Sequence, residues 1–249
     1  MGTGMRFRKS TAEKPREPPL KIQPGESNER AYGKKRFAKN ELIMSAGPSA
    51  RRSAILTIAG QTFLRHGYAD ASMDSIAAEV GGSKSTLYRY FPSKAALFAA
   101  YVEEVGTLVC ASLAAVDIDG REAEIVLVDT ARAYLDLILA PSALAVTRLV
   151  MAETGRFPEV GRMFYERGIQ RTERQISAIL QRLAERNSSP GWERLPLSGA
   201  AAHFRALCEA GPYERCIWGG HETVSAEEVE RVAQRAVTQF LYGRLTSSC

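Results

Sequence analysis

Apolar residues recur along most of the chain at intervals of three and four, which is the period of an amphipathic helix. The pattern is clear between residues 51 and 66, where Ile55, Ala59 and Phe63 are spaced by four and share one helical face. The alternation of apolar and polar residues that is typical of a half-buried strand appears nowhere. The pattern therefore predicts an all-α protein.

Glycines, prolines and capping residues divide this pattern into separate helices. In the N-terminal part, helices are expected at 51–66, 72–80 and 84–91, followed by a long helix at 93–115. A larger group is expected at 121–139, 141–153, 160–186, 197–210 and 225–245. We divide the chain accordingly into a tail (1–48), a small N-terminal domain (49–101) and a larger helical bundle (102–249).

Two of the short helices have the arrangement of a helix-turn-helix. Ser72 and Ser83 are placed to cap their N-termini, and Gly81-Gly82 forms the tight turn between them. In the second helix only Leu87 and Phe91 share an apolar face. The other side chains are cations, hydroxyls and phenols, which are the groups that reach base edges and phosphates. Taken alone, this helix could also be an ordinary solvated surface helix; its neighbours favour a DNA-reading role.

Residues 51–101 resemble the DNA-binding domain of the tetracycline-repressor (TetR) family of bacterial transcription regulators. The resemblance is carried by Ile55, Ala59, Phe63 and Gly67-Tyr68, by Ser72, Ile76-Ala77 and Val80-Gly81, by the run SKSTLYRYF at 83–91, and by Ser93-Lys94 with Leu97. It implies three DNA-binding helices followed by a ligand-binding and dimerisation bundle. Gly82 departs from the family pattern, which often has an aliphatic residue there. The bundle itself bears a weaker resemblance to the AefR-like C-terminal domains of the same family.

The resemblance also implies which residues contact double-stranded DNA. The expected contacts to base edges are Lys84, Ser85, Thr86 and Arg89, those to phosphates are Tyr88, Tyr90 and Lys94, and Ser72 and Ser83 complete the set at the two helix starts. Lys94 has a physical argument of its own, because a cation in the first turn of a helix opposes the helix dipole. A phosphate docked at that helix start would bind the ammonium and the free amides together.

The net charge is unevenly distributed. The chain has 33 Lys and Arg against 28 Asp and Glu, and residues 1–48 hold 11 of the former and 5 of the latter. The tail is rich in proline and glycine and lacks apolar periodicity, which predicts disorder. It is either an arm that strengthens non-specific DNA binding or an inert extension, including the case of a start codon placed upstream of Met44.

In the TetR family the bundle binds a small effector and forms a homodimer, usually through its last two helices. Here these would be Ala200–Ala210 and Glu228–Tyr242. Small residues would allow close approach of the helices and apolar ones would fill the interface: Ala200, Ala201, Ala202, Ala206, Ala233 and Ala236, with Phe204, Val232, Phe240 and Leu241. The alternative is that these residues pack the core of the monomer. One DNA-binding domain covers only half of an operator, so a dimer also follows from DNA geometry.

Polar and aromatic residues within the apolar stripes of the bundle are candidates for lining an effector pocket. They are Arg132, Tyr134, Arg148, Tyr165, His203 and Trp218. The arginines have an alternative role, because Asp129, Asp136 and Glu153 are available as internal ion-pair partners.

Other classes of function find little support. No phosphate-binding loop, dinucleotide fingerprint, nucleophile elbow or zinc-protease motif is present, so neither an enzyme nor a cofactor is expected. His203, Cys208, Cys216 and His221 lack the spacing of a zinc finger, and no metal is expected. The four cysteines are scattered and no apolar run has the length of a membrane span, which predicts a cytoplasmic protein without membrane contact.

The expected function is a homodimeric repressor that an unknown small molecule releases from a palindromic operator. Two other regulators remain as alternatives: one controlled by a protein partner or by cysteine oxidation, and a non-specific architectural DNA binder.

Overall fold

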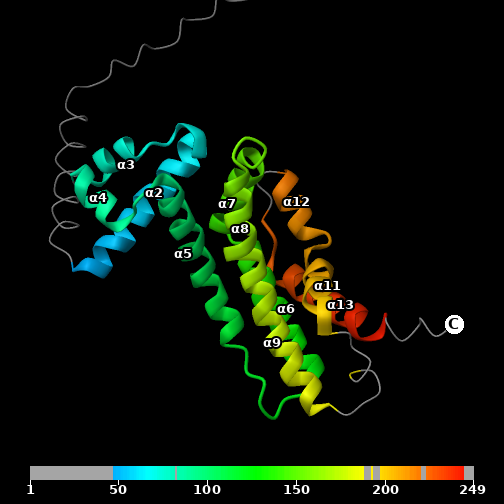
Figure 1. Cartoon of the computed structure of the whole chain (residues 1–249). Coiled ribbons are helices and arrows are strands. Elements are labelled where there is room, and N and C mark those ends of the chain that lie inside the picture. The colour runs from blue at the N-terminus through cyan, green and yellow to red at the C-terminus, as the bar shows by residue number, and fades with distance from the viewer. Residues whose placement is uncertain (1–46, 82, 188–191, 193–196, 220–222, 244–249) are drawn as a thin grey trace, which may run out of the picture. The chain divides into compact units, whose positions relative to one another are not determined.

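The computed structural model of the chain describes residues 47–81, 83–187, 192, 197–219 and 223–243 (Figure 1). These residues belong to one compact unit. Every regular element among them is a helix, so the prediction of an all-α protein is confirmed. The expected tail lies outside the described residues, apart from its last two positions.

Four helices begin the described chain, and we call this part the head. They are α2 (Pro48–Asp70), α3 (Met73–Val80), α4 (Lys84–Tyr90) and the start of α5 (Lys94–Ala114). Ser72, Ser83 and Ser93 each accept a hydrogen bond from a backbone amide three residues ahead, which confirms Ser72 and Ser83 as N-caps and gives Ser93 the same role in α5. Gly81 ends α3 in the left-handed conformation, with φ 75°. Local capping signals therefore determine the helix-turn-helix.

The head shares its core with helices that come later in the chain. Leu87 of α4 lies in the same buried cluster as Val146 and Val150 of α7 and Val160 of α8. The expected domain boundary at residue 101 lies inside α5, which continues without a break into the second part of the fold. A movement of α5 or α7 can therefore reach the head directly.

The remaining helices form what we call the body. They are α6 (Ala123–Ile138), α7 (Pro141–Glu153), α8 (Pro158–Phe164), the π-helical turn η1 (Tyr165–Ile169), α9 (Gln170–Arg186), α11 (Leu197–Glu209), α12 (Pro212–Gly219) and α13 (Ala226–Tyr242). The sequence predicted one regular helix over 160–186, and η1 interrupts it. It did not predict α12, because a Gly-Pro pair such as Gly211-Pro212 is typical of a turn between helices. Pro212 is instead the first residue of a helix, where a missing N–H costs nothing.

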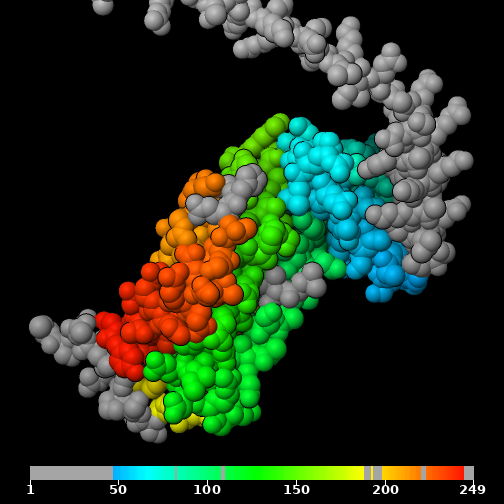
Figure 2. Space-filling model, turned by 180° about the vertical axis from the view of Figure 1, so that it is seen from behind, coloured from blue at the N-terminus to red at the C-terminus, as the bar shows by residue number. Residues whose placement is uncertain are grey.

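Helices α6, α9, α11 and α13 surround the core of the body. Figure 2 shows the orange and red helices α11–α13 lying against green segments of the body. Most residues expected at a dimer interface are buried in this core, with at most 5 % exposure: Ala200, Ala201, Phe204, Val232, Ala233, Ala236 and Phe240. The structure therefore favours the alternative that these residues pack the core of the monomer.

Within the described residues, no single helix is long and apolar enough to cross a bilayer. α6 and α7 reach the required length and composition only as a pair, and they are bent by 63° relative to each other. Both helices contribute side chains to the buried clusters of the fold.

Candidate DNA-binding surface and ligand cavity

The surface of α4 is polar apart from one apolar seam. Leu87 is 2 % exposed and Phe91, the C-cap, is 3 % exposed. The other expected contacts on this helix are accessible: Ser83, Lys84, Ser85, Tyr88 and Arg89 are exposed, and Thr86 and Tyr90 are partly buried. The structure therefore brings the expected DNA contacts of α4 together on one helix that is anchored by two apolar residues.

Hydrogen bonds hold the start of α4. Ser83 Oγ lies 2.8 Å from Ser85 Oγ and 2.9 Å from Thr86 Oγ1. Lys84 Nζ donates to Asp74 Oδ2 at 2.7 Å. Both members of this ion pair are largely exposed, so the pair contributes little to stability. Lys84 can therefore exchange Asp74 for a group on DNA.

Two further expected contacts have partners within the head. Ser72 forms a capping box with Ser75, in which the Ser72 hydroxyl accepts the Ser75 amide at 3.0 Å. The guanidinium carbon of Arg89 lies 5.6 Å from the centre of the Tyr90 ring, which is a cation–π distance. Ser72 and Arg89 remain exposed and accessible to a DNA backbone or base.

Lys94 lies in the first turn of α5, as expected, and its ammonium has partners within the head. Its ammonium donates to the backbone carbonyls of Tyr68, Ala69 and Ala71 at 2.7, 3.1 and 3.0 Å. An ammonium has three N–H donors, so none is left for a phosphate in this arrangement. The carbonyls at the end of α2 offset the unfavourable placement of a cation in the first turn of α5. These bonds give the side chain a structural role in the DNA-free protein, and its expected phosphate contact stays a prediction.

Glu153, the last residue of α7, holds the same segment through its amides. Its Oε1 accepts hydrogen bonds from the backbone N–H groups of Tyr68 at 2.8 Å and Ala69 at 3.2 Å. Gly67 precedes them at φ 80°, and a Cβ there would lie 2.7 Å from the same carboxylate oxygen. Glycine is thus required both by the backbone conformation and by the approach of Glu153. A body helix is tied to the end of α2 by charge-assisted hydrogen bonds.

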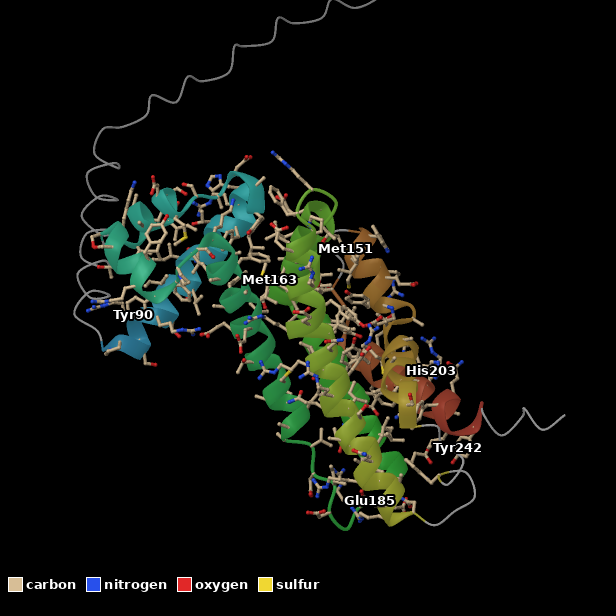
Figure 3. All side chains as sticks on the ribbon, in the orientation of Figure 1. Tyr90, Met151, Met163, Glu185, His203 and Tyr242 are labelled. Carbon is tan, nitrogen blue, oxygen red and sulfur yellow. The ribbon has the colours of Figure 1, made fainter. Side chains whose placement is uncertain are left out.

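The body contains a cavity of about 630 Å³. This volume falls within the range of pockets that bind drug-sized molecules, roughly 300–1,000 Å³. Its wall is mostly apolar and comes from α5, α6, α7, α8, η1, α9, α11 and α12. Met151 on α7 (labelled in Figure 3) and Tyr165 in η1 line it and are about half exposed. A π-helical turn in a cavity wall is a frequent feature of functional sites.

Polar side chains gather on one part of the cavity wall. The Tyr134 hydroxyl donates to Glu209 Oε1, and Arg205 Nη1 donates to the same oxygen at 2.5 Å. Arg205 Nε also donates to Glu173 Oε1 at 3.2 Å. Burial raises the pKa of the Tyr134 phenol well above its usual value, and the neighbouring Glu209 charge raises it further. The phenol therefore remains a hydrogen-bond donor at neutral pH.

Two of the six expected pocket residues, Tyr134 and Tyr165, line this cavity. Arg132 does not, because it forms ion pairs with Asp129 at 2.7 Å and Glu230 at 2.6 Å between α6 and α13. Internal pairing was the alternative that the sequence left open for this arginine.

The other three expected pocket residues also lie elsewhere. Arg148 donates to the backbone carbonyls of Ile217, at 3.2 Å, and Cys216, and it borders a second hollow between α6, α7 and α12. His203 is exposed on α11 (Figure 3), and Trp218 is 78 % exposed on α12. An aromatic or charged residue within an apolar stripe was therefore a poor indicator of the pocket.

Sequence reasoning missed the polar centre of the cavity. Arg205 and Glu209 lie on α11, which we had interpreted as a dimerisation helix, and Tyr213 lies on the unpredicted α12. The only local signal was the spacing of four between Arg205 and Glu209, which places opposite charges on one helical face.

The cysteines offer little reactivity. Cys110, Cys208 and Cys216 are buried, and Cys249 lies outside the described residues. Burial, with a smaller contribution from Glu209, raises the pKa of the Cys208 thiol to about 12. His221 of the considered zinc set also lies outside the described residues. Within the described chain, no three His, Cys, Asp or Glu residues are grouped so as to hold a metal.

Two family models match the chain. The model of bacterial regulatory proteins of the tetR family matches residues 55–101. The model of the C-terminal domain of AefR-like transcriptional repressors matches residues 125–243. The two matches cover most of the head and of the body.

Curated relatives match a shorter stretch. An HTH-type transcriptional repressor of Streptomyces coelicolor is 40 % identical over 57 residues, which are 23 % of this chain and 30 % of the relative. The DNA-binding transcriptional repressor TetR of Mycobacteroides abscessus is 42 % identical over 60 residues, or 24 % of this chain and 32 % of the relative. The chain thus spans about a third of the length of the curated relatives it matches.

Solved structures match over most of their length. A TetR-family transcriptional regulator from Mesorhizobium loti superposes with a TM-score of 0.64 at 27 % identity, covering 79 % of this chain and 98 % of that one. The flavonoid-responsive regulator FrrA superposes with a TM-score of 0.64 at 29 % identity, covering 78 % and 97 %.

Proposed function

This chain belongs to the TetR family of bacterial regulatory proteins, and we propose that it is a homodimeric repressor that leaves a palindromic operator when a small effector binds in the cavity of the body. Members of this family regulate transcription by binding DNA and are not enzymes. The proposal rests on three features: the surface of α4, the cavity, and the connection between them.

The first feature is the polar surface of α4. Lys84, Ser85, Thr86 and Arg89 are proposed to contact base edges, and Tyr88 and Tyr90 to contact phosphates. Cations and hydroxyls suit both tasks. One such helix reads half of a site, so a dimer would place two of them about 34 Å apart, in successive turns of the major groove.

The observation that carries effector control is the position of α7. This helix lines the cavity through Val146, Val150 and Met151, and its last residue, Glu153, holds the backbone at the end of α2. A ligand that shifts α7 would therefore shift the base of the head. Such a ligand changes operator affinity only as far as it binds the two arrangements differently.

A ligand-responsive role also has support from similarity. One similar solved protein is named a flavonoid-responsive regulator. What we carry to this chain is control by a small molecule, not the identity of that molecule. Oxidation of a described cysteine is a weaker alternative, because the three described thiols are buried and burial raises the pKa of Cys208.

For the dimer we propose the exposed faces of α11 and α13. On α11 this face carries His203 and Ala206, and the small side chain of Ala206 leaves room for a second helix to approach. On α13 it carries Arg231, Gln234 and Thr238. Sedimentation of an Ala206→Arg variant tests this proposal, which requires a shift toward monomer. A Gln181→Arg variant, on the exposed face of α9, is the control that should leave the dimer intact.

The proposed function is tested by operator binding with and without effector. DNA upstream of the protein's own gene is titrated with protein by fluorescence anisotropy, and compounds that bind the protein are then added. The expected result is release of DNA by wild type and loss of this response in Ala143→Trp, which fills the cavity. Ser142→Trp, exposed on the same helix, is the control and should respond normally. Compounds that bind the cavity without changing DNA affinity would contradict effector control.

A further inference from the structure

The charges on the cavity wall restrict the kind of molecule that the cavity can hold. Among the described residues that line it, only Arg205 and Glu209 are charged. Glu173 does not line it but forms an ion pair with Arg205. All three side chains are about three-quarters buried, so water screens their charges only partly.

The single cation of this group is already balanced. Arg205 donates to Glu173 and to Glu209, so one positive charge faces two negative ones and the group carries a net charge of −1. A ligand carboxylate placed here would add a further anion that no lining cation neutralises. Bringing like charges together in a partly buried site is unfavourable. An arginine in a cavity wall commonly indicates an anionic ligand; here the charge balance indicates the opposite.

The directions of the hydrogen bonds also disfavour a ligand carboxylate, and they favour a ligand that donates a hydrogen bond. Glu209 Oε1 accepts bonds from Tyr134 and Arg205, whereas Oε2 accepts none from the residues that the structure describes. An ionised carboxylate can only accept hydrogen bonds. A ligand that presents an O–H or N–H donor to Oε2 would therefore satisfy it, and a second carboxylate would not.

The rest of the wall indicates the body of the ligand. Away from Arg205 and Glu209 it is formed mostly by aliphatic side chains and by the rings of Phe164, Tyr165 and Tyr213, with three threonines between them (Thr147, Thr154 and Thr172). Burial raises the pKa of the Tyr213 phenol, which remains neutral at physiological pH. An apolar ligand with one or more aromatic rings gains most from such a surface, because rings stack edge-to-face or offset on one another.

We propose that the cavity takes a ring-bearing, amphipathic molecule that is neutral or cationic and directs a hydroxyl or amine donor at Glu209, and that it discriminates against carboxylates. This inference rests on the proposed effector function only for its regulatory meaning; the preference itself is a property of the cavity.

The test uses three probes with one skeleton: para-phenylphenol, para-phenylbenzylamine and para-phenylbenzoate. Binding of each to the full-length protein is measured by calorimetry at neutral pH. The phenol and the amine are expected to bind at least about tenfold more tightly than the benzoate, which corresponds to about 1.4 kcal/mol. Equal or tighter binding of the benzoate, or no measurable binding of any probe, would overturn the inference.

Variants test whether Glu209 causes the preference for the phenol and the amine over the benzoate. Glu209→Gln removes the excess negative charge and should weaken binding of the amine about tenfold while strengthening that of the benzoate. Glu185→Gln, an exposed carboxylate at the end of α9 (Figure 3), is the matched control and should bind all three as wild type does. Tyr134→Phe leaves the charges unchanged and should keep the preference for the amine, so that the inference stays testable if Glu209→Gln fails to fold. Loss of the preference in Tyr134→Phe, or its persistence in a folded Glu209→Gln, would contradict the role of Glu209.

The same probes separate this inference from the proposed function. If the phenol and the amine bind with the expected preference but operator affinity stays constant, the ligand class stands and effector control fails. If the benzoate binds best and releases DNA, effector control stands and the ligand class is wrong.

Discussion

The carboxylate of Glu153 accepts a hydrogen bond from the backbone amide of Tyr68 at 2.8 Å. It joins the last residue of a cavity-lining helix to the end of the first helix of the head. Lys94 binds the carbonyls of the same segment, so both the donors and the acceptors of Tyr68 and Ala69 are held by charged side chains. Head and body are thus coupled through a short stretch of backbone as well as through a shared apolar core.

We predict that Glu153→Ala destabilises the protein and weakens its response to effector. The loss in the free energy of unfolding is expected to be about 1.5–3 kcal/mol, the usual contribution of hydrogen bonds to a charged group. Glu153→Gln keeps an acceptor oxygen and should lose less. Urea denaturation measures the stability, and operator titration with and without effector measures the response. A full response in a stable Glu153→Ala variant would show that coupling takes another route.

Lys94→Met should lower stability rather than only weaken DNA binding. The substitution leaves three carbonyls at the end of α2 without their donor, and a loss of about 1–3 kcal/mol is expected. The dependence of operator affinity on salt should keep the slope of wild type. If Lys94 were a phosphate ligand instead, the free energy of unfolding would stay as in wild type. The slope of log affinity against log salt concentration would then become shallower by about one unit, as for the loss of one phosphate contact.

Arg89→Ala tests the surface of α4. Its guanidinium is exposed and placed for a base edge, so its removal should cost about 1–3 kcal/mol in operator binding with little change in stability. The control is Arg182→Ala, which removes the same charge from the exposed side of α9. Anisotropy titrations of operator and random DNA compare the two variants. Equal affinities for Arg89→Ala and Arg182→Ala would mean that Arg89 does not read DNA.

The buried phenol of Tyr134 predicts a loss of stability in alkaline solution. Burial, and then Glu209, raises its pKa in the folded state. The contribution of this phenol to the free energy of unfolding is fully present below the unfolded pKa of about 10. It decreases as pH rises above that value, because only the unfolded chain then releases the proton. This group alone should reduce the free energy of unfolding by about 1.4 kcal/mol per pH unit in that window. Tyr134→Phe should show a shallower decrease than Tyr165→Phe, whose ring is half exposed; parallel curves would contradict the assignment.

Local signals explain why the head was predictable. Ser72, Gly81 and Ser83 determine where helices begin and end within a few residues of themselves, and a sequence displays such signals directly. The cavity depends on contacts between distant segments: Tyr134 meets Glu209 across 75 positions. The periodicity of each helix shows which residues are buried, but not which helix they face.

Two features of the sequence were open to two interpretations each, for the same reason. The alanines of α11 and α13 were compatible with either a dimer interface or a monomer core, because close helix packing needs small residues in both cases; the structure places most of them in the core. Lys94 was compatible with either a phosphate or a set of carbonyls, since both offer oxygen acceptors to an ammonium. The three acceptors come from the backbone 23 to 26 residues earlier, where side-chain identity carries no information about them.

The central claim is that this chain is a sequence-specific, dimeric DNA-binding regulator. The most direct test is footprinting of genomic fragments, including the region upstream of its own gene, with purified protein at physiological salt. We predict one protected, near-palindromic site that is bound about 1,000-fold or more tightly than random DNA. Weak binding that is uniform over all fragments and disappears as salt is raised would contradict the claim.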